Sequence, residues 1–175
     1  MANIKFGDPE RLRVIETIQE LKNIKLKQIG NHKKFLRGSD EAYYCIVGGT
    51  ADWHGIPKDV MVHAIKDSSN FYLVIARLLK TKIELYMGPI KPLVDSRGSL
   101  TENQRGDFHF DLKTPIDNTL PIKQVSGARL YKVCEFGYDV EHVRETDSKF
   151  KHLLKSLSPA QMSQLLRELD IKVDG

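Results

Sequence analysis

Apolar residues recur at helical spacing near the start of the chain. Those that gather on one face of a 3.6-residue helix are Val14, Ile15, Ile18 and Leu21. The tripeptide Asp8-Pro9-Glu10 precedes them and supplies an N-cap oxygen, a proline suited to the first turn and a carboxylate near the positive end of the helix dipole. The pattern predicts a helix over residues 9–22.

The middle of the chain alternates short apolar, β-prone runs with glycine and proline breaks. The runs that predict strands are 42–47, 71–78, 82–87 and 129–136. The run 71–78 is apolar on both faces, so we expect it at the centre of a sheet. Residues 57–65 fit a short helix, although 60–65 also fit a strand, and we favour the helix. Residues 95–106 are rich in turn formers and predict a long loop.

The clearest two-residue alternation in the chain covers residues 107–113. Phe108, Phe110 and Leu112 point to one face of a strand. The opposite face carries the polar row Asp107, His109, Asp111 and Lys113. We expect the apolar face to pack and the polar face to meet solvent or a ligand.

Helical periodicity returns towards the C-terminus. Thr146 is a candidate N-cap for a helix that ends at Leu157, and Ser158-Pro159-Ala160-Gln161 fits a capping box that opens a second helix. Together the elements predict an α+β fold, with a central, mostly antiparallel sheet, an N-terminal helix and a C-terminal helical pair. We assign residues 1–140 to the α+β core domain and residues 141–175 to the helical pair, which we expect to pack on the same domain.

Length and composition are those of an ordinary globular protein. The chain has 175 residues, of which 41% are hydrophobic and 29% charged, and this suits one domain with one core. No run approaches 18 consecutive apolar residues, and residues 1–20 lack the pattern of a signal peptide. We therefore expect a cytoplasmic protein without a membrane partner, whose two cysteines, Cys45 and Cys134, are free and buried.

Several common chemistries lack their motifs in this sequence. Gly48-Gly49-Thr50 is not followed by the Gly-Lys-Ser/Thr of a phosphate-binding loop, and no Gly-x-Gly-x-x-Gly follows a predicted strand. No Gly-x-Ser-x-Gly elbow is present either. Phosphate-loop chemistry, hydride transfer and serine hydrolysis are therefore disfavoured, and we expect no cofactor for the leading interpretation below.

The segment 22–37 is the most unusual in charge, because it carries six cations and no acidic residue while the whole chain has a net charge of +4. Its cations are Lys22, Lys25, Lys27, Lys33, Lys34 and Arg37. Such a row can bind the phosphate backbone of DNA or RNA by counterion release. The leading hypothesis is therefore a nucleic-acid-binding domain without catalysis; the alternative is a solvated face that serves only solubility.

Trp53 and His54 form a second candidate site directly after the Gly48-Gly49 break. A tryptophan on a loop can stack on a base, and the neighbouring histidine can form a hydrogen bond with it. Trp53 can equally close the edge of the core, since large aromatic residues are highly buried on average.

Asp111-Leu112-Lys113 has the acid-x-lysine spacing of many metal-dependent nucleases, in which carboxylates hold a divalent cation such as Mg²⁺. Asp95 is the candidate second carboxylate and Glu84 a third. Across Asp95, Asp111 and Lys113 the chain resembles the nuclease superfamily named for its Pro-Asp and Asp/Glu-x-Lys motif, and this implies a catalytic role for these three residues. The chain departs from that pattern, because Val94 precedes Asp95 and residues 114–124 carry two prolines where a helix is expected.

A third interpretation concerns the C-terminal helical pair. Two short amphipathic helices can dock a protein partner, which would make the chain a protein–protein interaction module with an incidental basic face. The sequence thus leaves three functions open, with nucleic-acid binding favoured.

Overall fold

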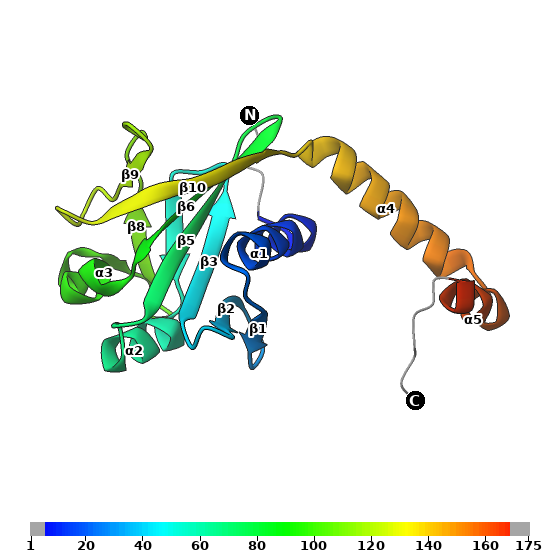
Figure 1. Ribbon diagram of the computed structural model, residues 1–175, viewed down its shortest axis with the longest axis horizontal. Helices are drawn as coiled ribbons and strands as arrows, with labels where there is room; N and C mark the ends of the chain where they lie inside the picture. The colour runs from blue at the N-terminus through cyan, green and yellow to red at the C-terminus, as the bar shows by residue number, and fades with distance from the viewer. Residues whose placement is uncertain (1–5, 169–175) are drawn as a thin grey trace. The chain divides into compact units, whose positions relative to one another are not determined.

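The computed structural model describes residues 6–168, and in this range the chain is an α+β protein (Figure 1). The side chains of residues 140, 141, 144, 147, 166 and 168 are outside the description. The elements in chain order are α1 (Asp8–Lys22), β1 (Leu26–Ile29), β2 (His32–Gly38), β3 (Tyr43–Gly49), β4 (Trp53–Ile56), α2 (Lys58–Lys66), β5 (Phe71–Leu78), β6 (Lys82–Pro89), α3 (Lys91–Asp95), η1 (Arg97–Ser99), β7 (Thr101–Glu102), β8 (Phe108–Asp111), β9 (Thr119–Pro121), β10 (Arg129–Gly137), α4 (Val140–Ser156) and α5 (Pro159–Glu168).

The main sheet has seven strands in the order β1-β2-β3-β5-β6-β10-β9. Every neighbouring pair is antiparallel except β3 and β5, which run parallel. The predicted mostly antiparallel sheet is therefore confirmed, and β5 lies between two strands as its apolar pattern requires. Strands β4, β8 and β7 form a second, three-stranded sheet in that order.

Helix α1 covers one face of the main sheet, and α2 and α3 lie on the other side (Figure 1). α1 buries Val14 and Ile18 completely. The larger core lies on the opposite face, where apolar residues of α2 and α3 join those of the two sheets. Phe110 of β8 belongs to this core, so the predicted apolar face of the strand near residues 107–113 packs inward.

Local signals place α1 and α2 close to their predicted positions. α1 begins at Asp8, and its N-cap is Gly7, whose backbone N–H donates to the Glu10 carboxylate at 2.9 Å. Asp8, which the sequence suggested as the cap, instead forms an ion pair with Arg11 at 3.0 Å. The favoured helix over residues 57–65 is confirmed as α2.

The prediction of a long loop over residues 95–106 is partly wrong. η1 and the two-residue strand β7 lie within it. β7 is short because it pairs with β8 only through Thr101 and Glu102. The polar segment 22–37, for which no strand was predicted, contains the hairpin β1–β2.

The chain divides into two compact units, residues 1–138 and 139–175. In the second unit α4 begins at Val140 and not at Thr146, because the side chain of Asp139 accepts a hydrogen bond from the His142 N–H at 3.0 Å. The capping box of α5 is confirmed. The backbone of Ser158 donates to Gln161 Oε1 at 2.9 Å, and the backbone of Gln161 donates to Ser158 Oγ at 3.3 Å.

Within residues 6–168 none of the helices has both the length and the apolar character needed to cross a membrane.

Replacing Ile18 by Ala is expected to lower the free energy of unfolding by about 2–5 kcal/mol, because it leaves a cavity between α1 and the sheet. Leu12 lies on the same helix and is 61% exposed. Leu12→Ala should therefore change stability by less than about 0.5 kcal/mol. Urea unfolding followed by tryptophan fluorescence measures both, and equal losses would contradict the placement of Ile18 in the core.

Candidate functional site

A cavity of about 330 Å³ lies beside the end of β3, where the chain leaves the main sheet for the small one. β3 ends at Gly49, and after three intervening residues β4 begins at Trp53 and pairs with β8. The cavity draws its lining from the start of the chain, β2, the end of β3 and β4: Phe6, Arg11, Lys34, Val47, Gly48, Gly49, Ala51, Trp53, His54 and Gly55. Three residues predicted to contact nucleic acid, Lys34, Trp53 and His54, therefore share one hollow.

Arg11 brings a guanidinium group to the cavity from the first turns of α1. Its side chain is 13% exposed, pairs with Asp8 and stands over the ring of Phe6, with Cζ 5.1 Å from the ring centre. Phe6 itself packs against the end of β3, where a Cβ on Gly48 would lie 3.0 Å from its ring and 2.6 Å from the Ala76 carbonyl oxygen. The glycine at position 48 thus leaves room for Phe6 at this end of β3.

Lys34 and His54 supply the other ionisable groups of the cavity. The ammonium group of Lys34 has no ion-pair partner in residues 6–168 and remains available to an anion. His54 is 6% exposed. Its burial, followed by the nearby charge of Lys34, lowers the pKa of the imidazole to about 4, so the ring is neutral at physiological pH.

Trp53 forms the outer wall of the site. The indole is 55% exposed, and one of its faces stacks on the ring of His109 with centroids 4.2 Å apart and an interplanar angle of 5°. His109 is held in turn by Asn103, whose Nδ2 lies 3.0 Å from Nε2. The indole is therefore fixed in orientation while much of its surface stays open to a planar ligand.

The remaining cations of segment 22–37 do not form a free row. The ammonium group of Lys22 lies 4.8 and 4.7 Å from the ring centres of Tyr44 and Tyr72 and pairs with Asp40 at 3.3 Å. The other paired residues are Lys33, which contacts Asp8 at 2.9 Å, and Arg37, which contacts Glu41 at 3.0 Å. Lys25 and Lys27 are exposed and have no ion-pair partner within the described range.

The residues predicted for a nuclease make other contacts. Asp95 ends α3 and forms an ion pair with Lys91 at 2.9 Å. Asp111 ends β8, and its carboxylate accepts a hydrogen bond from Gln124 at 2.6 Å. Lys113 lines a different hollow, of about 490 Å³, that also contains Arg129.

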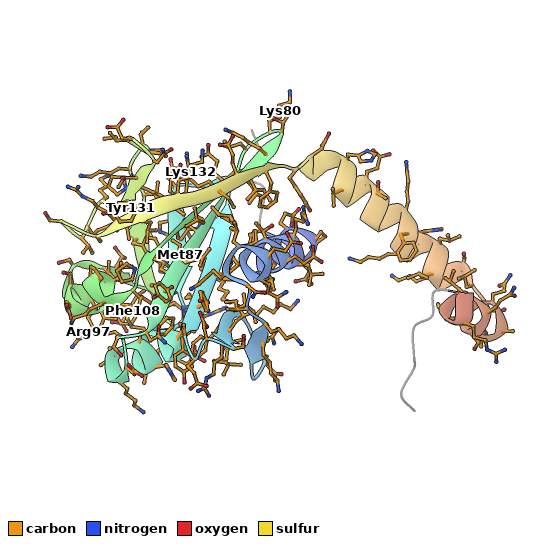
Figure 2. All side chains as sticks on the ribbon, in the orientation of Figure 1. Lys80, Met87, Arg97, Phe108, Tyr131 and Lys132 are labelled. Carbon is orange, nitrogen blue, oxygen red and sulfur yellow. The ribbon has the colours of Figure 1, made fainter. Side chains whose placement is uncertain are left out.

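The third candidate carboxylate, Glu84, is buried in β6. It is bonded to Lys82 at 3.1 Å, to Lys132 at 3.2 Å and to Arg77 at 3.3 Å; Figure 2 labels Lys132 on the neighbouring strand β10. Among the described residues no three His, Cys, Asp or Glu side chains gather where they could hold a metal ion. The structure therefore offers the nuclease interpretation no constellation of ligands.

Two residues of the site, Arg11 and His109, were not predicted from the sequence. Arg11 looked like an ordinary solvent-facing residue of α1, and only the tertiary fold carries it to the end of β3. His109 belonged to the polar row of its strand, but its partner Trp53 is 56 positions away, because β4 and β8 pair across α2 and β5 to β7. The residues of this polar row have different partners. Asp107 accepts a hydrogen bond at 3.1 Å from the backbone N–H of Lys58, at the start of α2.

The stacking of Trp53 on His109 is expected to depend on Gly55. A Cβ at position 55 would lie 2.7 Å from Cε1 of His109, so Gly55→Ala must displace the imidazole from the indole. We expect a weaker tryptophan band in near-ultraviolet circular dichroism, because the indole loses a fixed neighbour. Gly98 has open space at its Cβ, so Gly98→Ala is the control. An unchanged band in Gly55→Ala would refute the stacked geometry.

The buried neutral state of His54 predicts a loss of stability at mildly acidic pH. The unfolded chain takes up a proton near pH 6.5, whereas the folded protein keeps this imidazole neutral until about pH 4. Stability therefore falls as the pH drops through this window, by about 3 kcal/mol for the full shift. Urea unfolding of the wild type and of His54→Gln at several pH values isolates the effect. Parallel pH profiles would show that His54 makes no such contribution.

No family model matches the chain, and comparison with curated proteins and with solved structures finds no significant match. The case for a function therefore rests on the geometry of the cavity and on the chemistry of its lining residues.

Proposed function

We propose that the protein binds single-stranded nucleic acid, DNA or RNA, at the cavity beside β3 and acts there without catalysis. The observation that carries the proposal is the convergence of two cations, Arg11 and Lys34, with the exposed ring of Trp53 around one hollow. Proteins that bind single strands combine these two features, a positively charged groove for the backbone and aromatic rings on which bases stack.

Each of these residues has a separate role in binding. The ammonium group of Lys34 and the guanidinium group of Arg11 bind phosphate, and the open surface of Trp53 takes an unstacked base. A base inside a duplex cannot offer its face to the indole, and for this reason we propose single strands as the ligand. The exposed side chains of Lys25, directly before β1, and Lys27, on β1, add attraction along the nucleic-acid strand.

The cysteines and charges agree with a role in the cytoplasm, the location we propose. Cys45 and Cys134 are both free, and Cys45 is fully buried as predicted, whereas Cys134 is only partly buried. Free thiols are typical of a reducing compartment. No contact among the described residues favours the nuclease or the interaction module over nucleic-acid binding.

Binding of a fluorescein-labelled single-stranded oligonucleotide, followed by anisotropy at 50 and 200 mM salt, tests the proposal. We expect steep weakening with salt, because cations of the protein displace condensed counterions. Lys34→Gln should weaken binding about 3- to 10-fold and reduce the salt slope by about 0.7, the value for one phosphate contact on a single strand. Trp53→Ala should weaken it about 5- to 100-fold through lost stacking.

Lys66→Gln is the matched control, because it removes the same charge from the exposed end of α2, which leads to the start of β5 at the opposite end of the parallel pair from the cavity. Heparin provides an anionic ligand without bases, and Trp53→Ala should bind it as the wild type does. Absence of oligonucleotide binding at 50 mM salt, or equal losses in Lys34→Gln and Lys66→Gln, would overturn the proposal.

A further inference from the structure

Two residues that line the cavity each hold a buried nitrogen for which residues 6–168 provide no hydrogen-bond partner. These nitrogens are Nε of Arg11 and Nε2 of His54. A buried polar atom without a partner destabilises the folded protein, and such atoms are uncommon in folded proteins. Their occurrence on one cavity suggests that a bound ligand completes their hydrogen bonds.

The two nitrogens need different hydrogen-bond partners on that ligand. Nε of Arg11 is always protonated and can only donate. His54 is neutral, and its contact with the backbone of Ala51 raises its pKa, as hydrogen-bond donation by the ring does. We assign the proton of the neutral ring to Nδ1, because Nε2 has no partner and only Nδ1 is left to donate in this contact; Nε2 then carries a lone pair and accepts.

A bare anion satisfies only part of this arrangement. Phosphate oxygens at neutral pH accept hydrogen bonds from Arg11 and Lys34 but offer little to the lone pair of His54. A ligand that satisfies the whole lining must carry an anionic group and a hydrogen-bond donor a short distance apart. A nucleotide has both, and the volume of about 330 Å³ falls within the usual range of small-ligand pockets.

We propose that the cavity holds one nucleotide unit, whose phosphate contacts Arg11 and Lys34 and whose ribose 2′-hydroxyl or base amino group donates a hydrogen bond to Nε2 of His54. This inference rests on the proposed function and adds the unit that is bound and the residue that selects it. A site built around a buried acceptor rejects a ligand without the donor, because the acceptor then stays unpaired.

Trp53 is the only tryptophan of the chain and lines the cavity, so its fluorescence reports binding directly. The probes are adenosine 5′-monophosphate, its 2′-deoxy analogue and purine riboside 5′-monophosphate, which lacks the amino group. We expect adenosine monophosphate to quench Trp53 and one analogue to bind about 3- to 10-fold more weakly, the value of one hydrogen bond. The weaker analogue identifies the donor as the 2′-hydroxyl or the amino group.

The role of His54 is tested by two variants. In His54→Ala the wild-type preference should disappear, so that adenosine monophosphate and its analogue bind equally. His54→Gln keeps an acceptor oxygen and most of the side-chain volume, and it should retain part of the preference. Equal binding of all three probes by the wild type, or an unchanged preference in His54→Ala, would overturn the assignment of His54 as the selecting acceptor.

The oligonucleotide experiment separates this inference from the proposed function. Oligonucleotides that bind while all three mononucleotides fail to quench Trp53 would overturn the one-nucleotide pocket and leave nucleic-acid binding in place. Mononucleotides that bind while oligonucleotides do not would overturn nucleic-acid binding and support a pocket for free nucleotides. Failure of both sets of probes would refute both.

Discussion

The parallel pairing of β3 with β5 is the constraint on which the rest of the structure depends. The two strands are in register from Tyr43 opposite Phe71 to Gly49 opposite Arg77. Parallel neighbours cannot be joined by a tight turn, so the chain must cross from the end of one strand to the start of the other. β4 and α2 form this crossing, and α2 buries Val60, Met61 and Ala64 on the sheet. The position of β4, and with it that of Trp53 and His54, follows from the need to make this connection.

The same pairing explains why the cavity lies at the end of β3. In sheets with parallel strands, ligands commonly bind outside the carboxyl ends, where the connections leave the sheet. Here Phe6 and Arg11, before and within α1, reach that point from the face that α1 covers. Within the main sheet, the buried carboxylate of Glu84 is neutralised by the neighbouring lysines Lys82 and Lys132. Burial acts to raise the pKa of Glu84, but its bonds with Lys82 and Lys132 outweigh burial and lower it.

Local patterns predicted most of the fold, whereas the convergence of the site depended on topology. The periodicity of α1, the two-sided apolar run of β5 and the capping box at Ser158 each concern neighbouring residues, and each was confirmed. β1 was missed because its burial alternates too weakly, with no fully buried residue in Leu26–Ile29. Arg11 could not be identified as a lining residue, because nothing near it in sequence indicates which end of which strand α1 meets.

The basic segment shows why charge counted along a sequence differs from charge available in space. Segment 22–37 contains no acid, yet Asp8 at the start of α1 and Asp40 and Glu41 just after the segment neutralise three of its cations. Lys34 differs from those three because it lies on the cavity, where the lining residues include no carboxylate. A packed core could replace Arg11 and His54 by apolar residues without leaving buried nitrogens unpaired. Arg11 and His54 lower the stability of the free protein, and a bound ligand that pairs with their nitrogens would explain why they are retained. Such local conflicts with good packing are expected at functional sites.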